Sequence, residues 1–456
     1  MEVSYLESPC TDYVGEAIKT VWSIHLSEGP GDILVFLTGR DEIDRCIQAL
    51  ADRSLNLPSE SLPIKLVPLH AGLPSEEQVA IFVSSPKGTR KCIVATNIAE
   101  TSVTIDGVRF VVDCGFAKMR LFNPRSGMDV LATAPISKAS AAQRAGRAGR
   151  TSPGKCYRLW PFSAQEKLDA ASAPELARTD ITPYVLRLKA LGIDNLASFE
   201  YLPPPPPSGM MVRSLEFLSA LGALDDWGRF TQMGERMAEI PVDPMMSKSL
   251  LSSKDFMCTA EMLSIAAMLS ISNPFVIPDE GRSKAGAQAE LERRKFTAEE
   301  GDALTLLNTY MAFINPRIGK QSARWCGVHR INFKAMSRAV AIRSQLQRYM
   351  LRFGIDTSVS CEGDIERLVK CLVSGYFKNA ARRDANGDWR SVREDALLHV
   401  HPSSVLFNRN PKSGWVIYSE VVETTKSFMR DVTVIERVSL TLDLRLRQGG
   451  ASGTKD

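Results

Sequence analysis

The sequence predicts a multidomain protein in which an α/β domain with a parallel sheet is followed by a helical region and a small β-rich domain. Its 456 residues correspond to about three domains at roughly 150 residues each. Between residues 32 and 160, short apolar runs alternate with helical patterns, as they do in βαβ units. After residue 160 helical periodicity dominates, and beyond Cys361 short β-branched runs return.

Four apolar runs and the helical segments between them define the α/β domain. The runs are Ile33–Leu37, Ile64–Leu69, Lys91–Ala95 and Phe110–Asp113. Helices are expected over 41–50 and 75–83. Asp41 and Ser75 place oxygen acceptors, followed by acidic residues, where helix starts favour them.

The segment after residue 160 predicts a winged-helix module. The proline run 203–207 is typical of a stiff extended connector. A helix is expected over 208–221, with Gly222 as the residue after its end. Leu224 and Phe230, on either side of a turn, predict a two-stranded wing.

Two further domains complete the prediction. Helices prevail from Thr231 to about Arg352, where apolar residues recur at spacings of three and four. The clearest such stripe is Leu304, Leu307, Met311 and Ile314. Beyond Cys361, the turn at 386–387 and the runs 415–418 and 431–434 indicate a small β-barrel or sandwich.

Composition excludes several classes of protein. The formal net charge is +4, so the overall charge neither requires nor forbids an anionic partner. Nine cysteines without a CxxC pair, with only five histidines, favour reduced thiols and no metal site. No apolar run reaches the ~20 residues that span a bilayer, and acidic Glu2 and Glu7 are unlike a secretory peptide. The expected setting is nuclear or cytoplasmic.

The densest chemical signal is the octamer Gln143-Arg-Ala-Gly-Arg-Ala-Gly-Arg150. On a helix, Arg147 and Arg150 lie one turn apart, and two parallel guanidinium groups suit a polyphosphate. An arginine that meets the γ-phosphate contributes about 10³ to 10⁵ in rate. The alternative is a solvated basic helix. Against it, glycine costs roughly 1 kcal/mol relative to alanine in a helix, which indicates a close backbone approach to another group.

A second signal is the stretch from Val94 to Val108, in which a buried strand ends in a series of hydroxyl and amide side chains. Open α/β sheets bind ligands at the carboxyl ends of their strands. An ordinary turn, with Thr96 or Ser102 capping a helix, explains the stretch equally well.

Together these segments resemble the C-terminal half of DEAH-box RNA helicases, and in particular the spliceosome-associated members. FLTGRDEI is similar to that family's motif IV, ATNIAETSVTIDGV to motif V and QRAGRAGR to motif VI. The resemblance continues through LGALD, IPVDPMMSK, GDALTLLNTY, SGYFKNAAR and HPSSVLF, and so covers almost the entire chain.

The resemblance implies four domains and a tail. The implied boundaries are 1–31 for an entry segment from an absent first RecA-like domain, 32–160 for the second RecA-like domain, 161–230 for a winged helix, 231–355 for a ratchet-like helical bundle, 356–447 for an OB-fold and 448–456 for the tail. Residues 118–133 are expected to form a β-hairpin near the point of strand separation.

The same resemblance implies the site residues. Those expected to face the ATP phosphates are Gln143, Arg147 and Arg150. Those expected to contact the nucleotide's ribose and base are Ser102, Thr104, Asp106 and, by stacking, Phe82. Those expected to hold RNA phosphates are Thr38, Thr96 and Asn97. No metal ligand is expected in this chain.

The sequence contains neither a phosphate loop nor an acidic DEAH box, so ATP and Mg²⁺ are expected to be bound mainly by the first RecA-like domain. Residues 149–156 match GxxxxGK, but Cys156 offers no hydroxyl ligand to Mg²⁺ and Pro153 lacks a backbone N–H. We therefore expect the isolated polypeptide to be inactive in ATP turnover, although its family is enzymatic.

Two charged regions have both a binding and a structural interpretation. From Arg317 to Arg352 there are nine basic residues and no acidic ones, which is typical of an RNA channel wall, of a groove for acidic segments, or of a solvated helix face. Near the C-terminus, the aromatic residues Tyr376, Phe377 and Trp389 either stack on bases or belong to the core. His399 and His401 lack a third ligand for zinc.

Two classes of function follow. The first is the motor and RNA-clamping part of an ATP-dependent RNA helicase acting in splicing or ribonucleoprotein remodelling. Its expected partners are single-stranded RNA, the first RecA-like domain, and spliceosomal proteins or a G-patch-type activator. The second is a noncatalytic module that binds RNA or helicase partners. A winged-helix DNA regulator is weakly supported, because Asp225 and Asp226 beside the wing repel phosphate.

Overall fold

The computed structural model describes residues 1–55, 62–70, 73, 80–83, 86, 88–101, 105–123, 128–149, 153–277, 284–315, 321–423 and 426–437. The chain divides into two compact units, one of residues 1–120 and 131–174 and the other of residues 121–130 and 175–456. Each is considered by itself.

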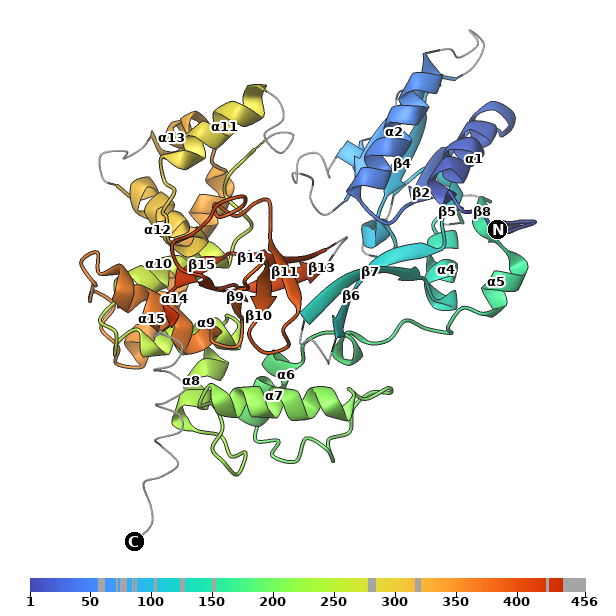
Figure 1. Cartoon of the computed structure of the whole chain (residues 1–456). Helices are drawn as coiled ribbons and strands as arrows, with labels where there is room; N and C mark the ends of the chain where they lie inside the picture. The colour runs from blue at the N-terminus through green and yellow to red at the C-terminus, as the bar shows by residue number, and fades with distance from the viewer. Residues whose placement is uncertain are drawn as a thin grey trace. The chain divides into compact units, whose positions relative to one another are not determined.

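The first unit is a RecA-like α/β domain around a six-stranded parallel sheet (Figure 1). The strands, in their order across the sheet, are β1 (Glu2–Leu6), β8 (Lys155–Pro161), β5 (Val108–Asp113), β2 (Asp32–Phe36), β4 (Arg90–Ala95) and β3 (Ile64–Leu69). The four strands predicted from apolar runs are confirmed. Residues 1–31, expected to lead into this domain, supply β1 and α1 to it.

Alternation along the buried strands separates two cores. Ile33 and Val35 face the core that contains α1 (Tyr13–Ser27) and α2 (Arg40–Ser54), whereas Leu34 and Phe36 face the opposite core. Ala145 of α4 (Lys138–Ala145) belongs to that opposite core. A parallel strand covered on both faces requires such a continuous apolar run, which is why these strands were predictable.

The remaining elements of the first unit are short. They are η1 (Ala80–Phe82), η2 (Asn97–Ala99) and α5 (Phe162–Glu166). The expected helix 75–83 is described only at its end, where 80–82 form a single 3-10 turn, because residues 74–79 lie outside the described residues. The predicted hairpin is present as β6 (Phe116–Asn123) and β7 (Met128–Pro135), and its turn lies outside the described residues.

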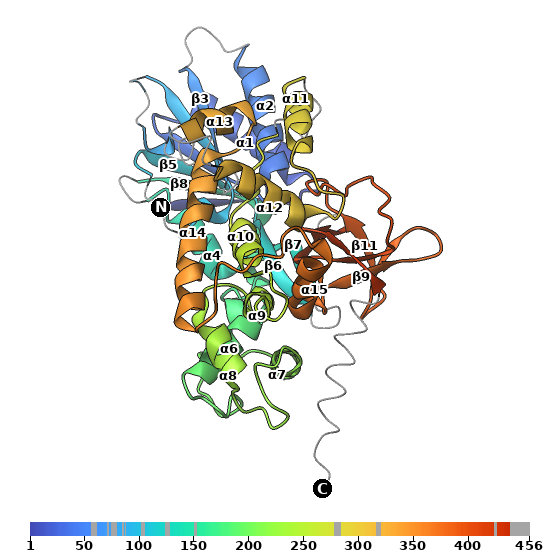
Figure 2. The same ribbon diagram turned by 90° about the vertical axis from the view of Figure 1, so that its left-hand side faces the viewer.

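The second unit begins with helices. They are η3 (Glu175–Ala177), α6 (Thr182–Ala190), α7 (Ser208–Ala220), α8 (Gln232–Glu239), α9 (Pro244–Ser252), α10 (Thr259–Leu269), α11 (Lys284–Arg294), α12 (Asp302–Phe313), α13 (Ser322–Val328), α14 (Phe333–Arg352) and α15 (Ile365–Tyr376). Gly222 adopts φ +78° immediately after α7, and Leu224 pairs with Phe230 in a one-bridge wing, both as expected. In Figure 2, α14 is the long helix beside α10, on which it packs.

The helix predicted from the spacing of Leu304, Leu307, Met311 and Ile314 is confirmed as α12, but its buried face is not this row of residues. Leu304 is buried, but Met311 and Ile314 are exposed, and the buried positions also include Leu306, Tyr310 and Phe313. The helix packs on α10 and on α13, so its buried surface is wider than a single row of residues. Sequence spacing alone did not reveal this second neighbour.

The chain ends in the predicted β-rich OB-fold domain, although α15 precedes its strands and packs on α9. The strands are β9 (Ala380–Arg383), β10 (Trp389–Ser391), β11 (Leu397–Val400), β12 (Trp415–Ile417), β13 (Glu420–Glu423), β14 (Ser427–Arg430) and β15 (Thr433–Ile435). Within this unit, Val130 of the hairpin pairs with Glu423. In the described part of the chain, no helix combines the length and apolarity needed to cross a membrane.

Candidate functional site

The sheet register brings together the three residues expected to bind RNA. Strands β2 and β4 are parallel neighbours in which Phe36 lies opposite Ala95. Thr38 and the pair Thr96–Asn97 therefore follow at the same edge, where open α/β sheets bind ligands. Thr38 is buried, Thr96 is half-buried and Asn97 is exposed, so the latter two are accessible.

Thr38 is held by contacts from two helices. Its backbone N–H donates to Glu42 Oε2 at 2.9 Å, and the Tyr13 hydroxyl donates to the other oxygen of the same carboxylate at 2.6 Å. Burial and the neighbouring Glu42 raise the pKa of Tyr13 to about 12, so this hydroxyl remains a donor at neutral pH. The backbone at the end of β2 is thus fixed before any ligand binds.

Arg144 connects α4 to two strand ends. Its side chain is fully buried. Nη1 donates to Asp113 Oδ1 at 2.8 Å, and Nε donates to Glu100 Oε2 at 2.9 Å. The guanidinium carbon lies 4.8 Å from the centre of the Phe36 ring. Burial acts to lower the pKa of Arg144, but the charges of Asp113 and Glu100 outweigh it and raise that pKa, so the arginine remains charged.

Glu100 is the centre of a network that joins the segment after β4 to α4. Its carboxylate accepts from Ser140 Oγ and from Arg144, while its backbone carbonyl accepts from Arg147 Nη2. Arg147 Nη2 also donates to the carbonyl of Thr101 at 2.6 Å. We refer to Glu100, Thr101, Ser140, Arg144 and Arg147 as the Glu100 network.

The other residues expected to contact the nucleotide divide into two groups. Gln143, Asp106 and Phe82 are exposed at the surface of the first unit. Ser102, Thr104 and Arg150 lie outside the described residues.

Arg147 and Arg150 were expected to lie one turn apart on a helix. This expectation is wrong for Arg147, which follows the end of the helix, and Arg150 lies outside the described residues. Helix α4 ends at Ala145, and residues 146–149 form turns in which each described N–H from Arg147 onward bonds three residues back. Gly146 occupies the C-cap, and its low helix propensity accounts for the early end. Arg147 is nevertheless buried, at 6% exposure, and not directed into solvent.

The glycines of this segment differ in what they require. A Cβ at Gly149 would meet only Met1 Cβ, at 3.9 Å, among the described residues. At Gly154 a Cβ would lie 2.1 Å from the carbonyl oxygen of Ala148 and 2.6 Å from that of Arg109, distances that exclude a side chain. The close backbone approach expected at the glycines of motif VI is not found at Gly149 among the described residues, whereas Gly154, which follows the motif, is closely packed.

The structure also accounts for the sequence that imitates a phosphate loop. Lys155 Nζ forms an ion pair with Glu28 Oε1 at 2.7 Å, and Cys156 is buried within β8. Lysine and cysteine therefore belong to a strand start and a core, which supports the rejection of this segment as a nucleotide cradle.

Sequence reasoning did not single out Arg144, Glu100 or Asp113. One signal was available: Ala141, Ala145 and Ala148 are all fully buried and share a face with Arg144. A charged residue among small apolar residues indicates a buried ion pair, because an unpaired charge there is too costly.

The basic run between 317 and 352 forms an exposed stripe on α14. Lys334, Arg338, Arg348 and Arg352 lie on one face of the helix and are exposed, together with Ser337, Ser344 and Gln345. Arg343 lies on the opposite face, where its Nε donates to Ser264 Oγ at 2.9 Å. Arg352 is paired with Glu239. Arg317 and Lys320 lie outside the described residues.

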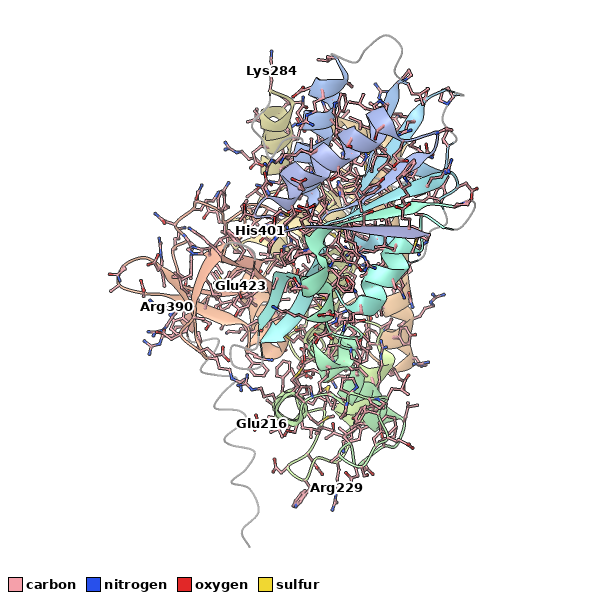
Figure 3. The ribbon with its side chains drawn as sticks, turned by 90° about the vertical axis from the view of Figure 1, so that its right-hand side faces the viewer. Glu216, Arg229, Lys284, Arg390, His401 and Glu423 are labelled. Atoms are coloured by element: carbon pink, nitrogen blue, oxygen red, sulfur yellow. The ribbon has the colours of Figure 1, made fainter. Side chains whose placement is uncertain are left out.

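The aromatic residues of the β-rich domain are mostly core residues. Tyr376 and Trp389 are buried, so neither presents a face to a base. Arg390, which extends from the outer side of this domain in Figure 3, donates from Nε to Asp384 Oδ2 at 3.0 Å. Over the described ranges, no three His, Cys, Asp or Glu side chains are arranged to hold a metal ion.

Comparison with known protein families assigns each domain. The helicase conserved C-terminal domain matches residues 16–152, the winged-helix part of the helicase-associated domain HA2 matches 214–242, and its ratchet-like part matches 243–306. An oligonucleotide/oligosaccharide-binding (OB) fold matches 368–442. These four matches occur in the order found in the C-terminal half of DEAH-box proteins.

The similarity to curated relatives extends over nearly the whole chain. The chain is 46% identical over 439 residues to the probable ATP-dependent RNA helicase DHX35 of Pongo abelii, covering 96% of this chain and 60% of that protein. This similarity and the four domain matches support the C-terminal half of a DEAH-box RNA helicase. Human DHX35 is 45% identical, with 96% of this chain and 61% of the relative covered.

A DEAH-box relative from a yeast extends the comparison. The pre-mRNA-splicing factor ATP-dependent RNA helicase prp22 of Schizosaccharomyces pombe is 44% identical over 437 residues, covering 95% of this chain and 36% of that protein. The chain thus spans about 60% of the DHX35 relatives and a smaller part of prp22. Its domains are those of the DEAH-box C-terminal half.

Proposed function

We propose that this chain is the motor and RNA-clamping part of an ATP-dependent RNA helicase that acts in pre-mRNA splicing or ribonucleoprotein remodelling. ATP and Mg²⁺ are held mainly by a first RecA-like domain that carries the phosphate loop. Arg147 and Arg150 act as arginine fingers toward the phosphates, with Gln143 beside them. The residues proposed for the ribose and base are Ser102, Thr104, Asp106 and Phe82.

The Glu100 network is the observation that supports this proposal most directly. Arg147 contacts the backbone of Glu100 and Thr101, which follow the RNA-contacting pair Thr96–Asn97 by only a few residues. A shift of Arg147 toward a phosphate therefore displaces the same segment that holds RNA. The chain's own contacts provide a short mechanical path between the two ligands.

Electrostatics accounts for the assignment of roles. Charge that develops on a transferring phosphoryl group is best stabilised by fixed guanidinium groups in a site from which water is excluded. Arg144 serves a different purpose, because its two carboxylate partners already neutralise it. We assign it the role of positioning residue, with Arg147 as the residue that faces ATP.

The RNA side of the proposal relies on accessible hydrogen-bond donors. Thr96 and Asn97 extend from a rigid strand end, and hydroxyl and amide groups there donate to phosphate oxygens without reading bases. The name of the prp22 relative, a pre-mRNA-splicing factor, supports a splicing-related role in the nucleus. Spliceosomal proteins or a G-patch-type activator are the partners that we propose.

Reconstitution tests the proposal. The polypeptide alone is expected to show no RNA-stimulated ATP hydrolysis, and addition of a purified first RecA-like domain is expected to restore it. Arg147→Ala is expected to lower the restored rate by about 10³, as for other arginine fingers. Arg53→Ala, an exposed arginine of α2, serves as the control and is expected to leave the rate unchanged. The thermal unfolding midpoint of Arg147→Lys shows whether a loss of rate comes from the missing guanidinium group or from a loss of folding. An unchanged midpoint together with a lower rate would indicate the guanidinium group.

The alternative is a noncatalytic module that binds RNA or protein partners, which the exposed basic stripe of α14 supports. RNA binding without rescue of hydrolysis by the added domain would favour this module. Hydrolysis by the chain alone, abolished by Arg147→Ala, would contradict the requirement for a separate phosphate loop.

A further inference from the structure

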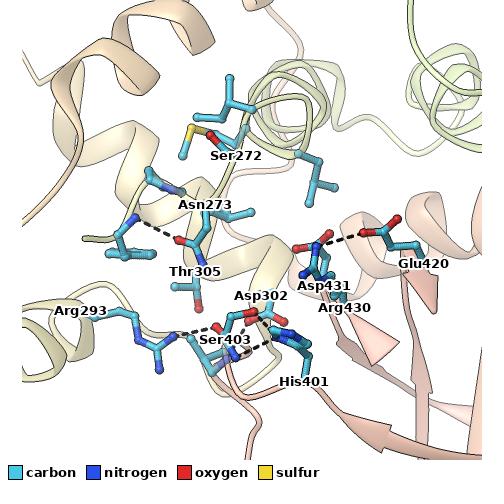
Figure 4. A pocket seen from close by; sticks show the side chains of 17 residues that line it. Ser272, Asn273, Arg293, Asp302, Thr305, His401, Ser403, Glu420, Arg430 and Asp431 are labelled. Carbon is cyan, nitrogen blue, oxygen red and sulfur yellow. Dashed lines mark hydrogen bonds and ion pairs between the residues drawn. The ribbon is translucent and has the colours of Figure 1, made fainter. Parts of the chain in front are cut away.

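A cavity of about 320 Å³ lies within the second unit, between the end of α10, the start of α12 and the β-rich domain (Figure 4). Its buried lining combines apolar side chains, such as Met268, Leu306 and Val405, with polar ones. Its outer lining is polar, with the exposed side chains of Ser272 and Asn273. A slot that combines apolar walls with a few polar groups is the usual form of a small-molecule site.

The wall of the cavity is built from buried polar groups. Asp302, at the start of α12, accepts from Ser404 Oγ at 2.6 Å and from the N–H groups of Val405 and Val432, both at 2.8 Å. Arg293 of α11 donates from Nη1 to the carbonyl of Ser403 at 2.8 Å. The cavity is therefore held open by bonds from α11 and the start of α12 to two segments of the β-rich domain, 403–405 and Val432.

Two arginines that line the cavity retain unused donors. The Nε atoms of Arg293 and Arg430 are buried and have no hydrogen-bond partner among the described residues. Arg293 is 7% exposed. Buried donors without partners are rare in folded proteins and call for an explanation, such as an absent ligand.

The charges lining the cavity determine which ligands fit. Three carboxylates, those of Asp302, Glu420 and Asp431, line the cavity together with two guanidinium groups. A phosphate or an acidic peptide would meet a net negative lining. A neutral planar group that carries donors on one edge and acceptors on another is favoured.

Arg430 and Asp431 lie next to one another in the cavity lining, as Figure 4 shows. The arginine offers hydrogen-bond donors and the aspartate offers acceptors. Arg430 Nη1 donates to Glu420 at 3.4 Å, and its Nε has no hydrogen-bond partner among the described residues. Asp431 accepts from Ser419 through Oδ2. Guanine presents N1–H and N2–H₂ to a carboxylate and O6 and N7 to a guanidinium. Adenine, cytosine and uracil each lack a second N–H donor group beside the first.

We propose that this cavity takes up one unstacked guanine base of bound single-stranded RNA. Asp431 accepts from N1–H and N2–H₂, Arg430 donates to O6 and N7, and the apolar lining covers the faces of the ring. The proposal rests on the RNA binding proposed above and adds base preference to a protein that otherwise grips phosphates.

Fluorescence anisotropy with short oligouridylates tests this inference. Replacement of one central uridine by guanosine is expected to lower Kd by about tenfold, in keeping with one good bidentate contact. Inosine lacks the N2 amine and 7-deazaguanosine lacks N7, so each is expected to lose most of that gain. Equal Kd values for the uridine and guanosine oligonucleotides would overturn the inference.

Variants locate the effect. Ser272→Trp blocks the rim at an exposed position, and it is expected to abolish the guanosine gain while leaving oligouridylate affinity unchanged. Ser208→Trp, at an exposed site at the start of α7, is expected to preserve both. Persistence of the gain in Ser272→Trp would refute the cavity as its source. Failure of every oligonucleotide to bind would refute the proposed RNA binding as well, whereas binding without preference refutes only the base pocket.

Discussion

The guanidinium of Arg144 lies 2.9 Å from the carboxylate of Glu100, and the arginine is fully buried while the glutamate is half-buried. This ion pair joins α4 to the segment after β4 across the carboxyl edge of the sheet. Since the segment carries the candidate RNA contacts, the pair fixes their position relative to motif VI.

Replacement of Arg144 is expected to be among the most damaging substitutions in the first unit. Arg144→Met leaves the buried carboxylate of Asp113 and the half-buried carboxylate of Glu100 without their shared partner, which costs about 3 to 5 kcal/mol of unfolding free energy. Urea denaturation measures the loss. Gln143→Met, at the exposed neighbouring position of α4, is the control and is expected to change stability by less than about 0.5 kcal/mol. A similar loss in both variants would mean that the ion pair is not the cause.

The two glycines that flank the end of motif VI are expected to respond differently to alanine. Gly154→Ala forces a Cβ against two backbone oxygens that cannot rotate away, so a loss of about 3 kcal/mol or more is expected. Gly149→Ala meets only an ordinary contact and is expected to leave thermal unfolding nearly unchanged. If Gly149→Ala nevertheless slows ATP hydrolysis in the reconstituted protein, the absence of a side chain at this position is required for binding of the nucleotide.

The stability of the second unit is expected to depend on pH through Asp302. Burial raises the pKa of this carboxyl from 3.8 to about 6. Between these values the folded chain binds the proton more tightly than the unfolded chain. The resulting stabilisation is fully present below pH 3.8 and is lost as pH rises through about 6. Two pKa units correspond to about 3 kcal/mol.

Comparison of urea midpoints isolates this effect. Asp302→Asn has no titrating group and leaves Ser404 Oγ and the Val432 N–H facing an amide, so it is expected to be less stable overall. The informative quantity is the change between pH 4 and pH 7, which is expected to be less negative in the variant. Parallel pH profiles for the two proteins would exclude Asp302 as the source.

The basic stripe of α14 distinguishes RNA binding from a solvated surface. Arg338→Glu and Arg348→Glu are each expected to reduce the dependence of log Kobs on log salt by at least about 0.7 for single-stranded RNA, if these side chains contact phosphates. Arg367→Glu, on the exposed face of α15, is the control. Unchanged slopes in both stripe variants would mean that the helix face is only solvated.

Sequence patterns predicted those elements whose burial is determined by local neighbours. Strands β2 to β5 are apolar on both faces because helices cover the sheet, and Gly222 marks the end of α7 because it adopts a left-handed conformation. Thr38, Thr96 and Asn97 were named by resemblance, and the pairing of β2 with β4 then brought them together.

The features that escaped prediction depend on partners distant in the chain. Arg144 is paired with residues 44 and 31 positions away, and the buried face of α12 is shaped by α10 and α13. The guanine cavity likewise combines α10, α12 and the β-rich domain, whose lining residues show no common motif. Periodicity describes which face of an element is apolar, but it does not specify which other element covers that face.

Gly154 illustrates how steric demand can imitate a ligand signature. Two carbonyl oxygens occupy the space that a side chain at this position would need. The following residue, Lys155, forms an ion pair with Glu28 at the C-terminal end of α1. A search for the pattern GxxxxGK would interpret residues 149–155 as a nucleotide-binding loop. The glycine of that match is instead required because the backbone at Gly154 packs against the backbone at Ala148 and Arg109. A search of DEAH-box sequences for additional ATP-binding loops therefore requires structures as well. In this chain the residues that match GxxxxGK are explained by packing within the domain.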